Sequence, residues 1–233
     1  AVMSSYFVLS TLPMYIAKLG GSEAETGLII GMFPLAALLI RPFIGRAADL
    51  WGRKRLIMMG ALALAISSIL YSAAVRVPSL LGLRIFHGIG WAAFSTGAAT
   101  LVADVAPASR RGEALGYYGI STHIAIAIGP PVGIYLAYAF GFPVVFISSV
   151  VAALAGLLLS TLLHDPFKKE TSYVDRRMVL VEGRALFPSA VLGLAALTWG
   201  SIVSFLPLFS IEKDIGNAGL FFTVYALAVV FTR

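Results

Sequence analysis

Residues 114–163 read ALGYYGISTHIAIAIGPPVGIYLAYAFGFPVVFISSVVAALAGLLLSTLL, a run of fifty in which His123 is the one titratable side chain of note. A helix that crosses the hydrocarbon core of a bilayer needs about 20 apolar residues. The run is therefore long enough for two such helices, and Phe140-Gly141-Phe142-Pro143 supplies the turn between them. This stretch predicts an all-α membrane protein.

The rest of the chain repeats this pattern of apolar runs separated by short polar segments. We expect eight spans, of which the first and last are incomplete, at residues 1–18, 25–45, 56–75, 80–103, 113–138, 143–163, 185–210 and 217–233. A helical bundle in water would show a polar stripe on each helix, and 56–75 has none. Because the chain opens at Ala1 and closes at Arg233 inside apolar runs, we expect a fragment cut at both ends.

The composition agrees with this class of fold. Hydrophobic residues make up 59% of the chain and charged residues 12%, whereas soluble domains carry roughly 25% charge. So few charges cannot form the polar shell of a soluble enzyme, a nucleic-acid-binding domain or a disordered chain. Cysteine is absent, which excludes a disulfide framework and a thiolate zinc site. We expect neither a cofactor nor a metal.

The net charge of +6 is concentrated on one set of alternate loops. That set holds eleven basic residues and the opposite set holds three, Lys18, Arg76 and Lys213. Lys and Arg mark cytoplasmic loops, so residues 46–55, 104–112 and 164–184 and the N-terminus are predicted to be cytoplasmic. The eleven are Arg46, Arg53, Lys54, Arg55, Arg110, Arg111, Lys168, Lys169, Arg176, Arg177 and Arg184.

The link at 164–184 is the longest and most polar in the chain, and it predicts a division into two parts. Residues 1–163 would form a six-helix bundle, and 185–233 would begin a second bundle. A weak internal repeat agrees: 27–41 aligns without a gap to 219–233, with five identities. Two halves related by a repeat are typical of secondary transporters, and a complete protein would then have about twelve spans.

The segment from Gly45 to Arg55, GRAADLWGRKR, is the strongest local motif. Gly45 has no side chain, so a neighbouring helix is expected to approach closely there. Asp49 can accept hydrogen bonds from a helix N-terminus, and Gly52 permits a tight turn. The basic residues Arg53, Lys54 and Arg55 are expected to hold the segment at the anionic inner leaflet of the membrane.

This segment resembles the signature loop of the major facilitator superfamily, Gly-x-x-x-Asp-x-x-Gly-Arg-Lys/Arg, with every defined position filled. The resemblance extends along the chain and includes Pro107–Gly116, which is similar to the family's loop between spans four and five. It implies that Asp49, Arg53 and Asp104, at the end of span four, form a charge cluster that latches the two halves. The alternative is a merely basic loop that orients the protein.

Arg84-x-x-x-Gly88-x-Gly90 on span four resembles the family's second motif. A cation within a membrane is costly and usually faces a cavity or a partner, and the resemblance links Arg84 to proton coupling. Alternatively, Arg84 snorkels to the outer surface. His87 stands where the family often has glutamine, and it is either a titrating group or a satisfied polar contact.

Gly129-Pro130-x-x-Gly133 on span five, with Gly119 upstream, resembles the motif of the family's exporters. The match is incomplete, because Ala125 and Ile134 replace glycines of the fuller pattern, so a plain packing face remains the alternative. His123 is a candidate cavity residue.

The family's use of spans one, four and seven predicts a polar cavity face. Its members would be Ser4, Ser5, Ser95, Thr96, Thr100, Thr198, Trp199 and Ser204. Interhelical hydrogen bonds are the alternative role of these hydroxyl groups.

The resulting hypothesis is a secondary transporter that works by alternating access, with proton-coupled efflux of a drug-like or metabolite solute. The first alternative is an importer of a small metabolite or sugar, and the remote ones are a multi-span receptor and an intramembrane enzyme. Expected partners are the lipid bilayer, a small solute and protons, but not nucleic acid. The complete protein is expected to be a monomer in a plasma membrane, as in the bacterial inner membrane.

Overall fold

A computed structural model describes residues 1–74, 76–165, 183–214 and 219–232 of the protein. Each of the eight predicted spans is a helix, and a 3-10 turn at Ala108–Arg110 joins the fourth to the fifth. The helices are α1 (Val2–Lys18), α2 (Glu23–Trp51), α3 (Arg53–Ala73), α4 (Val77–Val105), α5 (Arg111–Phe140), α6 (Phe142–Thr161), α7 (Gly183–Glu212) and α8 (Gly219–Thr232). Most of the predicted link between the two bundles, 166–182, lies outside the described residues.

The helices have the length and surface of membrane spans. Six of them, α2 to α7, are long and apolar enough to cross a bilayer, whereas α1 and α8 are shorter, at 17 and 14 residues. Large apolar side chains cover the outside of the bundle; Leu38 and Leu39 on α2, for example, are each 65% exposed. Such a surface needs lipid around it, so this is an all-α, multi-pass membrane protein.

Two of the predicted loops are largely helical. α2 does not end at residue 45 but continues to Trp51, and α3 begins at Arg53. The charges of 46–55 do not break the helix, because α2 continues through Pro42 and these charges as far as Trp51 and ends at Gly52. In the predicted loop 104–112, α4 continues to Val105 and α5 begins at Arg111.

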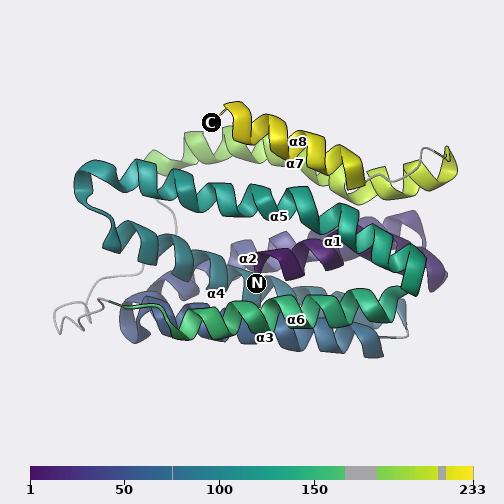
Figure 1. Ribbon diagram of the computed structural model, residues 1–233, viewed down its shortest axis with the longest axis horizontal. Coiled ribbons are helices and arrows are strands. Elements are labelled where there is room, and N and C mark those ends of the chain that lie inside the picture. Colours follow the sequence, from purple (N-terminus) through teal and green to yellow (C-terminus); the bar gives the residue numbers. More distant parts are fainter. Residues whose placement is uncertain (75, 166–182, 215–218, 233) are drawn as a thin grey trace.

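The helices run along the long axis of the molecule, with α7 and α8 together along one side (Figure 1). α3 packs between α4 and α6, α2 packs on α4, and α1 packs between α5 and α6. α8 lies against α5, and α7 contacts α1 and, more lightly, α2. Among the described residues, α7 and α8 therefore cover the side formed by α1, α2 and α5.

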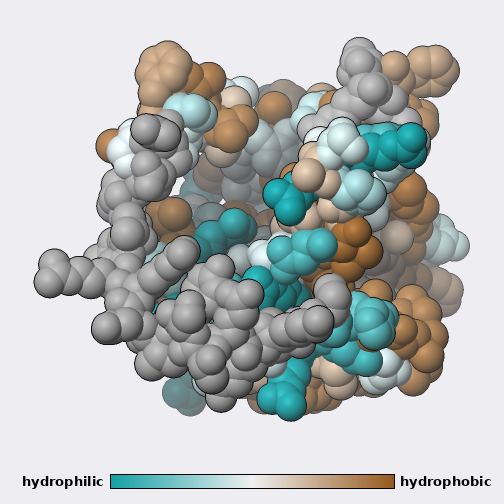
Figure 2. All heavy atoms as spheres, turned by 90° about the vertical axis from the view of Figure 1, so that its left-hand side faces the viewer, coloured by the Kyte–Doolittle hydropathy of each residue, from teal (hydrophilic) through white to brown (hydrophobic). Residues whose placement is uncertain are grey.

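We call one end of the bundle the basic end; it carries the α2–α3 joint, the α4–α5 turn and the C-terminal end of α6. This end lies at the left of Figure 1 and faces the viewer in Figure 2, where hydrophilic residues gather between brown, apolar flanks. At the opposite end, Gly141 has a φ of 85° and turns the chain from α5 to α6. The predicted turn at Phe140–Pro143 is thus confirmed.

Candidate functional site

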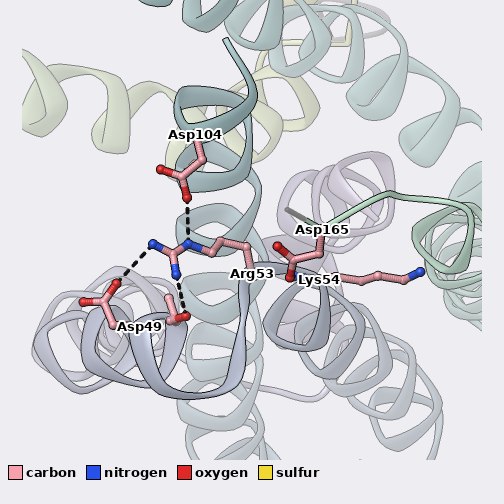
Figure 3. A network of polar contacts seen from close by, with 6 residues as sticks. Asp49, Arg53, Lys54, Asp104 and Asp165 are labelled. Carbon is pink, nitrogen blue, oxygen red and sulfur yellow. Dashed lines mark hydrogen bonds and ion pairs between the residues drawn. The ribbon is translucent and has the colours of Figure 1, made fainter. Parts of the chain in front are cut away.

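The first polar centre of the molecule is a charge network at the basic end, built around Arg53 at the start of α3 (Figure 3). Its Nε lies 2.8 Å from Oδ2 of Asp104 on α4. Its Nη2 lies 3.3 Å from Oδ1 of Asp49 on α2, and its Nη1 donates to the Ala48 carbonyl oxygen at 3.1 Å. One guanidinium therefore ties together the ends of three helices.

Gly52 makes this geometry possible because it alone separates α2 from α3. Its φ of 91° lies in the region that glycine adopts without strain. The predicted tight turn is confirmed, and it places Asp49 four residues before Arg53 across the joint. Among the described residues, a Cβ at Gly45 would meet no atom within 4 Å, so the close helix approach expected there is not observed in this part of the protein.

Lys54 belongs to a second part of the network that joins α3 to the end of α6. Its backbone N–H donates to Oδ2 of Asp165 at 2.9 Å, and its ammonium donates to the Thr161 carbonyl oxygen at 2.6 Å. Asp165, rather than Asp49, thus caps a helix N-terminus in the described structure. The predicted attachment of Arg53, Lys54 and Arg55 to the inner leaflet stays a prediction; in the described structure Arg53 and Lys54 bind protein groups and Arg55 is exposed.

Sequence reasoning missed Asp165, which lies 111 residues from the backbone that it caps. Aspartate is a preferred acceptor for the free N–H groups of a helix. No spacing rule connects it to α3, because the contact arises only when α6 packs against α3.

The second polar centre lies inside the membrane region, on α4. The Arg84 side chain is 1% exposed, and its Nε and Nη2 donate to the Ile29 and Ile30 carbonyl oxygens of α2 at 3.3 and 3.5 Å. The guanidinium carbon lies 4.5 Å from the centre of the Phe33 ring, a cation–π distance. Arg84 is thus buried against α2, and the alternative in which it snorkels to the outer surface is not observed.

His87 lies one turn after Arg84 and is fully buried. Its Nε2 is 3.1 Å from the Ser5 hydroxyl of α1, and its Nδ1 is 3.3 Å from the Tyr71 hydroxyl of α3. The Phe33 ring packs edge-on against the imidazole, with 5.1 Å between ring centres. Ser5 and Tyr71 were not predicted as partners, because interhelical contacts leave no pattern in the sequence.

A cavity of about 610 Å³ opens beside these residues, between α1, α2 and α4 on one side and α7 on the other. Arg84 lies on its wall, and so does Ser5, which connects it to His87. The lining residues are Ser5, Tyr6, Leu9, Gly27, Ile30, Gly31, Phe33, Pro34, Arg84, Trp91, Gly193, Ala196, Leu197, Trp199, Gly200, Ser201, Val203, Ser204 and Phe205. Aromatic and small side chains predominate among these described residues, and Arg84 is the one charged side chain among them.

Of the eight predicted cavity residues, the wall includes Ser5, Trp199 and Ser204. Ser4 instead forms a buried cluster with Ser68 of α3 and Ser149 of α6, with hydroxyl distances of 3.4 and 2.8 Å. For Ser4, the structure therefore shows interhelical hydrogen bonds in place of a position on the cavity wall. The side-chain oxygens of Ser95 and Thr96 are buried without a hydrogen-bond partner among the described residues.

Three further residues proposed for coupling or for the cavity lie elsewhere. A Cβ at Gly88 would lie 2.5 Å from the Phe33 carbonyl oxygen, and one at Gly90 would lie 2.8 Å from the Ala63 Cβ. These glycines therefore let α4 pack on α2 and α3. His123 is half-buried and bonds through Nδ1 to the Gly119 carbonyl oxygen of its own helix at 2.8 Å, away from the cavity wall.

The span-five motif packs on α1. A Cβ at Gly129 would lie 2.6 Å from the Tyr6 Cβ, and one at Gly133 would lie 3.1 Å from the Ser10 hydroxyl. Pro130 is buried inside α5 between them. Of the two interpretations, the geometry favours a packing face. In the part of the chain that the structure describes, no group of three or more His, Asp or Glu side chains is arranged to hold a metal ion.

Comparison with known proteins gives one family for the whole chain. The family model described as Major Facilitator Superfamily matches residues 1–233. The chain is 27% identical over 165 residues to the quinolone resistance protein NorA of Staphylococcus aureus, covering 71% of this chain and 42% of NorA. It is 30% identical over 234 residues to the uncharacterized MFS-type transporter YhhS of Shigella flexneri, covering 97% of this chain and 57% of YhhS.

Solved structures agree in fold. A crystal structure of a D-xylose–proton symporter matches 98% of this chain and 63% of its own length, with a TM-score of 0.66 and 16% identity. The xylose transporter XylE of E. coli, in an inward-open conformation, matches 92% of this chain and 53% of its own, with a TM-score of 0.57 and 17% identity. The chain thus spans about half the length of the curated relatives described above.

Proposed function

The chain belongs to the Major Facilitator Superfamily, and on this basis we propose that it forms the first bundle and the start of the second bundle of a secondary transporter that works by alternating access. In this proposal residues 1–163 are the first bundle, 164–184 the cytoplasmic link, and 185–233 the opening of the second bundle. Membership in a family of transporters argues against the receptor and the intramembrane enzyme.

The observation that carries the proposal is the cavity between the first bundle and α7. Its wall combines residues from α1, α2 and α4 with residues from α7, which in this proposal belongs to the other bundle. Binding sites of secondary transporters lie near the middle of the membrane at such an interface. A solute held there would be exposed to one side or the other as the bundles rock.

The network at the basic end is the proposed latch. It consists of Asp49, Arg53 and Asp104, with Gly52 as the joint, and it lies on the predicted cytoplasmic side. An interaction that exists in one conformation only shifts the balance between conformations by its own free energy. Lys54 supports the latch indirectly by tying α3 to α6, and Gly45 is included in the proposed latch because of the sequence motif alone.

The proposed direction is efflux coupled to inward proton flow, across a plasma membrane such as the bacterial inner membrane. The support is the similarity to a quinolone resistance protein, together with Arg84 and His87 beside the cavity. Import is the second candidate, and the symporter-like fold is compatible with it. The complete protein is proposed to act as a monomer.

Cysteine accessibility tests alternating access without knowledge of the substrate, because this chain contains no cysteine. In the full-length protein freed of other cysteines, Ser201→Cys places a thiol on the cavity wall. A membrane-impermeant maleimide should label it from one side in one conformation, and Asp49→Asn should change the ratio of labelling from the two sides. Equal labelling from both sides that the variant leaves unchanged would contradict the mechanism.

Orientation and direction have separate readouts. Ser109→Cys at the basic end should react only from the cytoplasm, and Ser79→Cys at the start of α4 only from outside. In proteoliposomes with an imposed proton gradient, a quinolone should move in the direction opposite to the proton flow if the protein is an exporter. Movement in the same direction as the protons would favour the importer.

A further inference from the structure

Arg84 is the one charged side chain on the cavity wall, and its described neighbours are all neutral. Two carbonyl oxygens of α2 accept its hydrogen bonds at long distances, 3.3 and 3.5 Å, and the Phe33 ring covers one side of the guanidinium. The Tyr71 hydroxyl also interacts with it. No described carboxylate lies within ion-pair distance of Arg84, in contrast to Arg53 at the basic end.

The acidic residues of the described chain are all remote from the cavity. They lie near the two ends of the helices: Glu23, Glu25, Asp49, Asp104, Glu113, Asp165, Glu212 and Asp214. None of them lines the cavity. The other titratable groups near Arg84 are His87, Tyr71 and Tyr6, none of which is an anion at neutral pH. This part of the cavity therefore has a positive potential.

A buried cation without a counter-ion is costly, and an anion that enters the same low-dielectric site offsets that cost. The planar guanidinium fits a carboxylate in particular, because its N–H groups can donate to both oxygens at once. The remainder of the wall favours a ring or another apolar body, since it presents the side chains of Phe33, Trp91 and Trp199.

We propose that this cavity selects an amphipathic anion, a carboxylate carried on an aromatic or apolar body, with Arg84 as the group that binds the carboxylate. The inference rests on the proposed transport function and names the substrate class of the same site. A cavity of about 610 Å³ has room for a ligand of drug size. Amphipathic cations of the same shape are disfavoured there by the charge of Arg84.

The test uses three probes that share a naphthalene ring and differ in charge: 1-naphthoate, 1-naphthalenemethanol and 1-naphthylmethylammonium. Their binding to the full-length protein in nanodiscs is measured by titration calorimetry, with empty nanodiscs as the blank. Wild-type protein should bind the naphthoate roughly tenfold more tightly than either of the other two, as expected for a charge-assisted contact in a buried site.

Three variants locate the effect. Arg84→Gln should weaken naphthoate binding by about tenfold and leave the alcohol unchanged, whereas Arg84→Lys should keep the order anion before cation. Arg76→Gln, which removes an exposed arginine at the start of the same helix, should bind like wild type. Size-exclusion profiles identify variants that fail to fold. If Arg84→Gln fails to fold, Arg84→Lys carries the test.

A wild type that binds the ammonium or the alcohol at least as tightly as the naphthoate would overturn the proposal, and so would an Arg84→Gln variant with unchanged naphthoate affinity. Counterflow of the preferred probe in proteoliposomes separates this result from the fate of the transport proposal. Preference for the cation together with counterflow defeats only the anion inference. Naphthoate binding through Arg84 without counterflow supports the inference and defeats the transporter.

Discussion

The two polar centres of the molecule hold their cations in opposite ways. At the basic end Arg53 is paired with two carboxylates, one of which, that of Asp49, is 54% exposed. In the interior Arg84 is buried, and its described partners are carbonyl oxygens, an aromatic ring and a hydroxyl group. Partly exposed ion pairs add little to stability but can easily be broken and remade, whereas a buried cation without a carboxylate is retained at a cost. The first arrangement suits a conformational contact, and the second suits binding.

The interior centre depends on close contact between α4 and α2, so overpacking there should have the largest effect. In Gly88→Ala the new Cβ would lie 2.5 Å from the Phe33 carbonyl oxygen. Backbone atoms cannot move aside easily, so we expect a loss of unfolding free energy of about 2 kcal/mol. The measurement is the melting temperature of the purified full-length protein in detergent.

Gly82→Ala is the matched control on the same helix, because a Cβ there meets no atom within 4 Å. Both variants gain the same helix propensity, so their difference isolates the contact with α2. If Gly88→Ala melts at or above the temperature of Gly82→Ala, the close packing of α4 on α2 is disproved.

Breaking the other centre should affect transport more than stability. Asp49→Asn removes one charge from the network, and its exposure limits the loss of unfolding free energy to less than about 1 kcal/mol. Transport in proteoliposomes should fall by about tenfold, because a contact made in one conformation biases the whole cycle. Glu113→Gln, an exposed acid at the same end and outside the network, is the control. A full rate in Asp49→Asn would remove the latch from the mechanism.

The junction of α3 and α6 should show a smaller effect, on stability alone. Asp165→Ala leaves the Lys54 N–H without its acceptor, and loss of such a cap costs about 1 kcal/mol. Asp165→Asn keeps an oxygen that can accept the same hydrogen bond and should recover most of the melting temperature. Equal losses in the two variants would mean that the charge of Asp165, and not its capping bond, is what stabilises this junction.

The serine cluster between α1, α3 and α6 should show the smallest effect. Ser149→Ala removes hydroxyl contacts to Ser4 and Ser68, each 2.8 Å long. Interhelical hydrogen bonds in membrane proteins contribute about 0.6 kcal/mol on average, so the melting temperature should fall slightly. Ser121→Ala on α5 removes a bond within one helix and serves as control. A loss as large as that of Gly88→Ala would show that polar contacts, rather than close packing, dominate the interior of the bundle.

Comparison of sequence and structure shows what kinds of information the chain carries locally. The eight helices follow from runs of apolar residues, and the turns at Gly52 and Gly141 follow from the need for a positive φ. The end of α2 was misplaced, because the prediction took the charges after Gly45 as the end of the helix, although helices can continue into water.

The candidate sites were predictable only in part, because their contacts join residues of different helices. Arg84 and Arg53 stand out because charge is rare in this chain. The partners of His87 come from α1 and α3, and the cap on α3 comes from beyond α6. Such contacts depend on which faces of the helices meet. The sequence alone does not specify those faces, since all sides of these helices are apolar.

The joint at Gly52 has a mechanical consequence. Two rods that meet at a single residue would normally hinge freely, but here the Arg53 side chain reaches back across the joint to the Ala48 carbonyl oxygen and to Asp49. The Arg53 guanidinium thus fixes the angle between α2 and α3 at Gly52. A change in the angle between α2 and α3 requires both contacts to break together. The angle should therefore change in one cooperative step and not gradually.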